Sequence, residues 1–220
     1  MNDGLWIRFA RRIFGAAVLV VVASLAAATE PAKVTERVLV FGDSLAAAYN
    51  IDPKEGWVSL LAEKMRPAGV EIVNASISGE TTAGGLSRIR ADLQRHKPTI
   101  VLLELGANDA LRGLPLKDTR ANLEAIVAAC RKAGARVIVV GIQIPPNYGL
   151  DYATQFRDLY PQLATSQKLG LVPFLLDGIA DKLENFQADR LHPIAAVQPR
   201  IVENVLPELR KAMNRANPHR

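Results

Sequence analysis

The chain has 220 residues and a formal net charge of +5, with 49% hydrophobic and 22% charged residues. These values are typical of one globular α/β domain with a substantial core. The small excess of positive charge and the aromatic content of 5% argue against a nucleic-acid partner. The single cysteine, Cys130, excludes an intramolecular disulfide and leaves a Cys/His zinc site short of ligands.

Residues 1–28 are predicted to be an export signal. Arg8, Arg11 and Arg12 precede an uncharged run over residues 13–28, which ends in three alanines. This layout is typical of a cleavable bacterial signal peptide, and the run is shorter than the roughly 20 residues that span a bilayer. We expect a single domain over residues 29–220 that is periplasmic or secreted and meets the membrane only through this signal. A retained membrane anchor stays an alternative.

Beyond residue 30, short apolar runs alternate with amphipathic stretches. In chain order, the pattern predicts strand 37–42, helix 57–66, strand 70–74, helix 82–94, strand 99–105, helix 116–133, strand 136–141, helix 152–169 with a break near Pro161, strand 171–174 and helix 196–213. Nearly continuous apolar strands that alternate with helices predict a parallel sheet covered on both faces. Such sheets bind ligands at the carboxyl ends of their strands.

Three residues follow the first three strands and should meet at that edge. Ser44 comes after Gly42-Asp43 at a predicted strand-to-helix turn, where a helix start would favour an anion. Gly79 and Asn108 follow the second and third strands, and a glycine N–H and an asparagine amide are suitable donors to an oxyanion. The structural alternatives are a helix N-cap for Ser44 and ordinary turn positions for the other two.

The nucleophile and its base have few rivals in the sequence. Ser76 and Ser78 lie in a loop without an acid–histidine pair in the pattern, which makes them weaker candidates than Ser44. Asp189 precedes His192 by three residues, so its carboxylate can bond one ring nitrogen and leave the other free as a base. A local surface turn is the alternative for this pair. Together these residues supply what an acyl-transfer hydrolase needs.

Four blocks in this order resemble the SGNH, or GDSL, hydrolase family. They are Gly42-Asp43-Ser44-Leu45, residues 74–79, Gly106-Ala107-Asn108-Asp109 and residues 189–193. Residues 103–114 and 144–149 look like the bacterial periplasmic thioesterase/lysophospholipase and arylesterase subgroup. The chain departs from the family pattern at Arg190-Leu191, where a smaller Gly-Ile pair is often found, and at Ile194, where asparagine is common.

The resemblance implies a flavodoxin-like fold, a three-layer α/β/α sandwich around a five-stranded parallel sheet. It implies that Ser44 is the nucleophile of a serine esterase, His192 the general base and Asp189 its orienting acid. The implied oxyanion hole consists of the Ser44 N–H, the Gly79 N–H and the Asn108 amide. Neither a metal nor an organic cofactor is implied.

Two apolar segments should border the cleft and bind the acyl group of a small-molecule or lipid ester. The candidate residues are Leu111, Leu114, Ile144, Pro145 and Tyr148. They predict a mobile site for short to medium chains; alternatively, the leucines only pack their segment against the domain. The rival functions are a glycan O-deacetylase with the same site and a non-catalytic acyl- or lipid-binding module. Residues 79–85 lack the dinucleotide fingerprint and the phosphate-loop lysine, which argues against nucleotide binding.

Overall fold

The computed structural model describes residues 34–214, so the predicted export signal lies outside the described part of the chain. Five strands form one sheet in the order β2-β1-β3-β4-β5, and every neighbouring pair is parallel. The strands are β1 Glu36–Gly42, β2 Val70–Asn74, β3 Ile100–Glu104, β4 Arg136–Val140 and β5 Gly170–Val172. The predicted five-stranded parallel sheet is confirmed.

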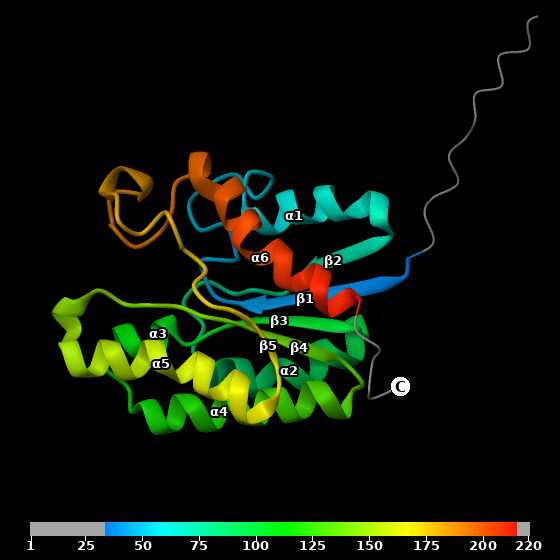
Figure 1. The fold of residues 1–220 in the computed structure, drawn as a ribbon, viewed down its shortest axis with the longest axis horizontal. Helices are drawn as coiled ribbons and strands as arrows, with labels where there is room; N and C mark the ends of the chain where they lie inside the picture. The colour runs from blue at the N-terminus through cyan, green and yellow to red at the C-terminus, as the bar shows by residue number, and fades with distance from the viewer. Residues whose placement is uncertain (1–33, 215–220) are drawn as a thin grey trace, which may run out of the picture. The chain divides into compact units, whose positions relative to one another are not determined.

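Helices cover both faces of this sheet (Figure 1). Helices α1 Trp57–Met65 and α6 Gln198–Met213 pack together on one face. The other face carries α2 Thr82–His96, α4 Leu116–Lys132 and α5 Leu150–Gln167. Short connecting elements are α3 Ala107–Leu111 and the 3₁₀ turns η1 Arg66–Ala68, η2 Pro146–Tyr148, η3 Leu183–Asn185 and η4 Ala195–Val197. The predicted α/β/α layering is therefore confirmed.

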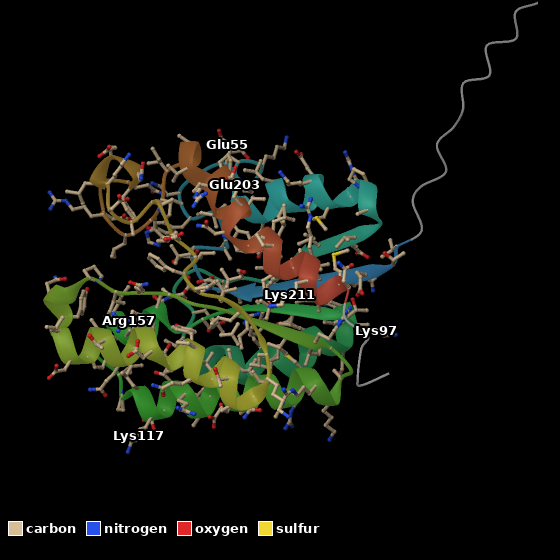
Figure 2. All side chains as sticks on the ribbon, viewed as in Figure 1. Glu55, Lys97, Lys117, Arg157, Glu203 and Lys211 are labelled. Atoms are coloured by element: carbon tan, nitrogen blue, oxygen red, sulfur yellow. The ribbon has the colours of Figure 1, made fainter. Side chains whose placement is uncertain are left out.

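The side-chain alternation of β1 divides the core into two halves. Val38 and Val40 belong to the cluster under α1 and α6, whereas Leu39 and Phe41 belong to the cluster under α2, α4 and α5. Because successive side chains of a strand point to opposite faces, an uninterrupted apolar run can serve both layers. The exposed charged residues Glu55, Lys97 and Lys117 lie on the outside of these layers (Figure 2).

Three local predictions differ from the structure. Residues 44–50 form consecutive turns and the first helix begins at Trp57, so Ser44 does not lie at a helix start. Asn108 lies in the one-turn helix α3, which is too short to produce an amphipathic pattern. Helix α5 continues through Pro161, where a break was predicted. Its buried side chains on both sides of the proline, including Tyr160 and Leu163, hold the helix against the core.

No helix within residues 34–214 combines the length and apolar character needed to cross a membrane.

Candidate active site

Ser44, His192 and Asp189 form a continuous chain of hydrogen bonds. The Nε2 atom of His192 lies 2.8 Å from Ser44 Oγ, although the two residues are 148 positions apart. The Nδ1 atom of the same ring lies 2.7 Å from Asp189 Oδ2. Ser44 follows β1 directly, and the other two residues lie in the loop between η3 and η4. The sequence alone could not show whether Ser44 and His192 meet, and in the fold they are in contact.

Asp189 is held in the orientation that serves His192. Its Oδ1 atom accepts hydrogen bonds from the backbone N–H groups of Leu191 at 2.9 Å and His192 at 3.0 Å. Partial burial would raise the pKa of Asp189, but these N–H groups and the His192 ring outweigh it and lower the pKa. The carboxylate is therefore ionised near neutral pH and keeps a proton on the Nδ1 atom of His192.

The loop that carries His192 closes on itself. Phe186 and Pro193 form an antiparallel bridge, and the Gln187 N–H donates to the His192 carbonyl at 2.8 Å. Arg190 has a φ of +59°, in the left-handed region that favours glycine. The structure thus explains why a glycine suits this position, where this chain carries an arginine with an exposed side chain.

Three hydrogen-bond donors of the predicted oxyanion hole are not fully used within the described part of the chain. Among residues 34–214, the backbone N–H groups of Ser44 and Gly79 have no hydrogen-bond acceptor. Asn108 Nδ2 uses one of its hydrogens on Asp43 Oδ2, at 3.1 Å, and keeps the second. Unpaired donors of this kind are able to stabilise a developing negative charge.

The Gly79 and Asn108 segments are tied to each other. Gly79 has a φ of +79°, which a side chain at this position would disfavour, and its carbonyl accepts a hydrogen bond from Arg112 Nη2 at 3.0 Å. Asp109, next to Asn108, accepts the backbone N–H of Thr82 at 2.9 Å and also bonds the Thr82 hydroxyl. These links place the two donor-bearing segments at a defined separation.

A pair of buried acids, Asp43 and Glu104, adjoins Ser44. Asp43 and Glu104 are both 0% exposed, and the Asp43 N–H donates to Glu104 Oε2 at 3.1 Å. Gly42 pairs with Glu104 across the sheet, and a Cβ atom at Gly42 would lie 2.3 Å from Glu104 Oε2. The glycine of the Gly-Asp-Ser block is therefore required by the close approach of this carboxyl group.

Burial controls the protonation of both acids. It raises the pKa of Asp43 to about 7, with a smaller contribution from the charges of Asp109 and Glu80, although the Leu45 N–H and the Asn108 amide act in the opposite direction. Burial and the neighbouring Asp43 charge raise the pKa of Glu104 well above its usual range. Glu104 Oε1 has no hydrogen-bond partner within the described residues. Both of these effects favour the neutral form of Glu104, which accepts one hydrogen bond, whereas Asp43 accepts one on each of its two oxygens.

The residues predicted to bind the acyl group divide into two sets. Ile144 is buried in the core cluster on the α4 and α5 side, and Leu111 packs against that cluster. Leu114, Pro145 and Tyr148 are exposed. The Leu114 carbonyl accepts a hydrogen bond from Tyr152 Oη at 2.7 Å, which fastens the α3–α4 connection to α5.

Some residues around the site were not predicted. Tyr49 contacts the His192 ring, and together with Ala48 and Ile51 it lines a small recess next to Ser44. Nothing in the local pattern identifies this loop, because its contact partner is far away in the sequence. Glu104 and Arg112, in contrast, lie within the segment 103–114 that carries the family resemblance. The rival serines differ from Ser44: Ser78 is exposed, and the buried Ser76 hydroxyl has no partner in the described part of the chain.

The residues in range 34–214 contain no group of three or more His, Cys, Asp or Glu side chains placed to hold a metal ion.

The chain is similar to several known proteins. A model of the GDSL-like Lipase/Acylhydrolase family matches residues 40–198. Esterase TesA of Pseudomonas aeruginosa is 45% identical over 177 residues, which cover 80% of this chain and 88% of that protein. Thioesterase 1/protease 1/lysophospholipase L1 of Escherichia coli is 36% identical, over 83% of this chain and 88% of that protein. The crystal structure of the psychrotrophic esterase EstA from Pseudoalteromonas sp., inhibited by monoethylphosphonate, superposes with a TM-score of 0.78 at 40% identity, covering 82% of this chain and 100% of that one.

Proposed function

The chain belongs to the GDSL-like lipase/acylhydrolase family and is a serine esterase, and we propose that Ser44, His192 and Asp189 are its catalytic triad. The observation that carries this assignment is the pair of contacts made by one imidazole ring, 2.8 Å to Ser44 Oγ and 2.7 Å to Asp189 Oδ2. A hydroxyl, a base and an acid that orients the base are the three parts of an activated serine nucleophile.

In the acylation step, Ser44 Oγ attacks the ester carbonyl while His192 Nε2 takes its proton. The resulting imidazolium stays paired with Asp189, which remains an anion. The tetrahedral intermediate then collapses as His192 Nε2 returns the proton to the leaving oxygen or sulfur. The alcohol or thiol departs, and an acyl-serine remains.

Deacylation repeats the sequence with water. His192 Nε2 removes a proton from the attacking water, a second tetrahedral intermediate forms, and the Ser44 oxygen leaves with the proton that His192 returns. The acid product is released and the starting state is restored. In both steps the negative oxygen would be stabilised by the Ser44 N–H, the Gly79 N–H and the second hydrogen of Asn108 Nδ2.

The substrates that suit this site best are esters with short to medium acyl chains. The proposal places the acyl group along Leu111 and Leu114 and beside the segment over residues 144–148. The burial of Ile144 and the contact of Leu111 with the core support an apolar floor, and the exposure of Leu114 and Tyr148 supports an open rim. An open apolar site of this kind would accept several leaving groups.

Replacement of Ser44 and His192 tests the triad. We expect Ser44→Ala and His192→Ala to lower the turnover of a nitrophenyl acetate by about 10⁴-fold or more without loss of the fold. Ser78→Ala is a matched control, because Ser78 is exposed in a neighbouring loop and should retain full activity. A fluorophosphonate probe should label the wild-type protein and not Ser44→Ala. Unreduced hydrolysis by Ser44→Ala would exclude the assignment.

We also propose that residues 1–28 direct the protein to the periplasm or the medium and are then removed. The basic residues followed by an uncharged run and three alanines support this location. Amino-terminal sequencing of the protein from its native cells is the test. A mature protein that starts close to residue 29 is expected, and one that retains Met1 in the cytosolic fraction would contradict the proposal.

A further inference from the structure

The phenol ring of Tyr49 lies against the imidazole ring of His192. The ring centroids are 4.3 Å apart and the ring planes are inclined by 36°. Tyr49 belongs to the turn segment after Ser44, so the contact joins the nucleophile's own loop to the loop of the histidine. Tyr49 is 46% exposed, and packing into the hydrophobic core therefore does not explain its position.

The backbone around Tyr49 is held in an unfavourable conformation. Ala48 and Asn50, on either side of it, have φ values of +57° and +56°. This left-handed region disfavours residues that carry a Cβ atom, and such strain persists where the surroundings impose it, often at functional sites. Ala48 also packs closely on Gly56, where an added Cβ atom would lie 2.7 Å from the Ala48 Cβ. The fold thus imposes the turn that directs Tyr49 towards His192.

Gln187 fastens this turn to the histidine loop. Its Nε2 atom donates to the Tyr49 carbonyl at 2.9 Å and to the Pro193 carbonyl at 3.2 Å. Its Oε1 atom accepts a hydrogen bond from Asn50 Nδ2 at 3.1 Å. The Gln187 backbone N–H also donates to the His192 carbonyl. One residue therefore sets the distance between the Tyr49 ring and the His192 ring.

We propose that Tyr49 is a positioning residue of the esterase reaction, which keeps the His192 ring in the orientation that contacts both Ser44 and Asp189. This inference rests on the proposed function, because it requires His192 to be the base. The Tyr49 ring closes one face of the imidazole, so rotation of the imidazole away from Ser44 is opposed. An aromatic face also attracts the positive charge that the imidazole carries during turnover.

The test compares two replacements of Tyr49. We expect Tyr49→Leu, which removes the ring, to lower kcat for a nitrophenyl acetate about 3- to 10-fold, with a change in KM below about twofold. Tyr49→Phe keeps the ring and should restore kcat, because the Tyr49 hydroxyl has no hydrogen-bond partner within residues 34–214. Leu183→Ala is the matched control, since Leu183 is an exposed residue of η3 and should leave both constants unchanged.

A second variant tests the same idea without altering the ring. Gln187→Ala removes the side chain that joins the two loops and should also lower kcat. If Tyr49→Leu does not fold, this variant still tests the proposal. Wild-type kcat in Tyr49→Leu, or equal losses in Tyr49→Leu and Tyr49→Phe, overturns the inference, as does unchanged kcat in Gln187→Ala. His192→Ala, measured in parallel, separates the two proposals: an active His192→Ala refutes the triad, whereas an inactive one beside a fully active Tyr49→Leu refutes only the role of Tyr49.

Discussion

Asn108 Nδ2 donates a hydrogen bond to Asp43 Oδ2 at 3.1 Å, and this bond connects a proposed oxyanion donor to the residue that precedes Ser44, the proposed nucleophile. The side chain of Asn108 has a terminal torsion with broad preferences, so an acceptor is needed to hold its amide in one orientation. Asp43 supplies that acceptor from a position that is completely buried. The bond therefore couples the block Gly106-Ala107-Asn108-Asp109 to the block Gly42-Asp43-Ser44-Leu45.

Replacement of Asn108, the proposed oxyanion donor, should lower kcat more than replacement of Asp43, its acceptor. Asn108→Ala removes one of three proposed donors to the oxyanion, and we expect kcat to fall by about 10²–10³-fold with little change in KM. Steady-state kinetics with a nitrophenyl acetate measures both constants. Loss of activity through a higher KM alone would contradict a role that is confined to the transition state.

Replacement of the acceptor should have a smaller effect of the same kind. Asp43→Asn leaves one oxygen for two donors, the Leu45 N–H and Asn108 Nδ2. We expect kcat to fall about 10-fold, less than in Asn108→Ala. Asp151→Asn, at an exposed position, is the control and should behave as the wild type. Full activity of Asp43→Asn beside a defective Asn108→Ala would show that the bond does not orient the amide.

Arg112 should influence kcat because it binds the Gly79 carbonyl. Its guanidinium donates to the Gly79 carbonyl at 3.0 Å and thereby restrains the peptide plane that follows Gly79, next to the proposed N–H donor. We expect Arg112→Ala to lower kcat about 2- to 10-fold, which corresponds to the loss of one hydrogen bond. The exposed Arg95→Ala is a control for the change in charge. Equal activities in the two variants would rule out this positioning role.

The buried acids should make the stability of the protein depend on pH. Burial raises the pKa of Asp43 from its ordinary 3.8 to about 7, so between these values the native state retains protons that the unfolded state releases. The free energy of unfolding should therefore decrease as the pH rises through this window, by roughly 4 kcal/mol at most from this group. Urea unfolding at pH 5 and pH 8 measures the decrease.

Glu104→Gln should make the free energy of unfolding less dependent on pH. The variant removes a second buried acid whose pKa is raised by burial and by the Asp43 charge, and its amide oxygen can still accept the Asp43 N–H. We expect the difference in unfolding free energy between pH 5 and pH 8 to be smaller than in the wild type. Glu184→Gln, at an exposed position of η3, should leave the difference unchanged. An equal pH dependence in wild type and Glu104→Gln would contradict the account.

Acyl-chain preference should respond to Leu114. This exposed leucine is proposed to contact the acyl chain, and its removal deletes apolar contact that only a longer chain can use. We expect Leu114→Ala to lower kcat/KM for an octanoyl nitrophenyl ester about 5- to 30-fold and to leave the acetyl ester nearly unchanged. A strict preference of the wild type for acetyl esters, or equal losses on both substrates, would contradict an apolar acyl site.

Local patterns were sufficient for the layers and for most element boundaries. The run of apolar residues in β1 and the 3.6-residue spacing in α4 depend on neighbours along the chain, so the periodicity revealed them. Periodicity could not reveal two other elements. Helix α3 has only five residues, and the turns after Ser44 have no regular spacing of apolar residues. The tolerance of Pro161 within α5 depends on core contacts on both sides of it.

The amino-acid order alone carried the chemistry: a serine after β1, a glycine and an asparagine after the next two strands, and an acid–histidine pair near the end. The contacts between these residues could not be read from neighbouring positions in the sequence. They join segments that are far apart in the chain and that the folded sheet brings together. The contacts of Ser44 with His192, of Asp43 with Asn108, and of Tyr49 with His192 all have this origin. The protonation of Asp43 likewise depends on burial, which arises only once the layers have closed over it.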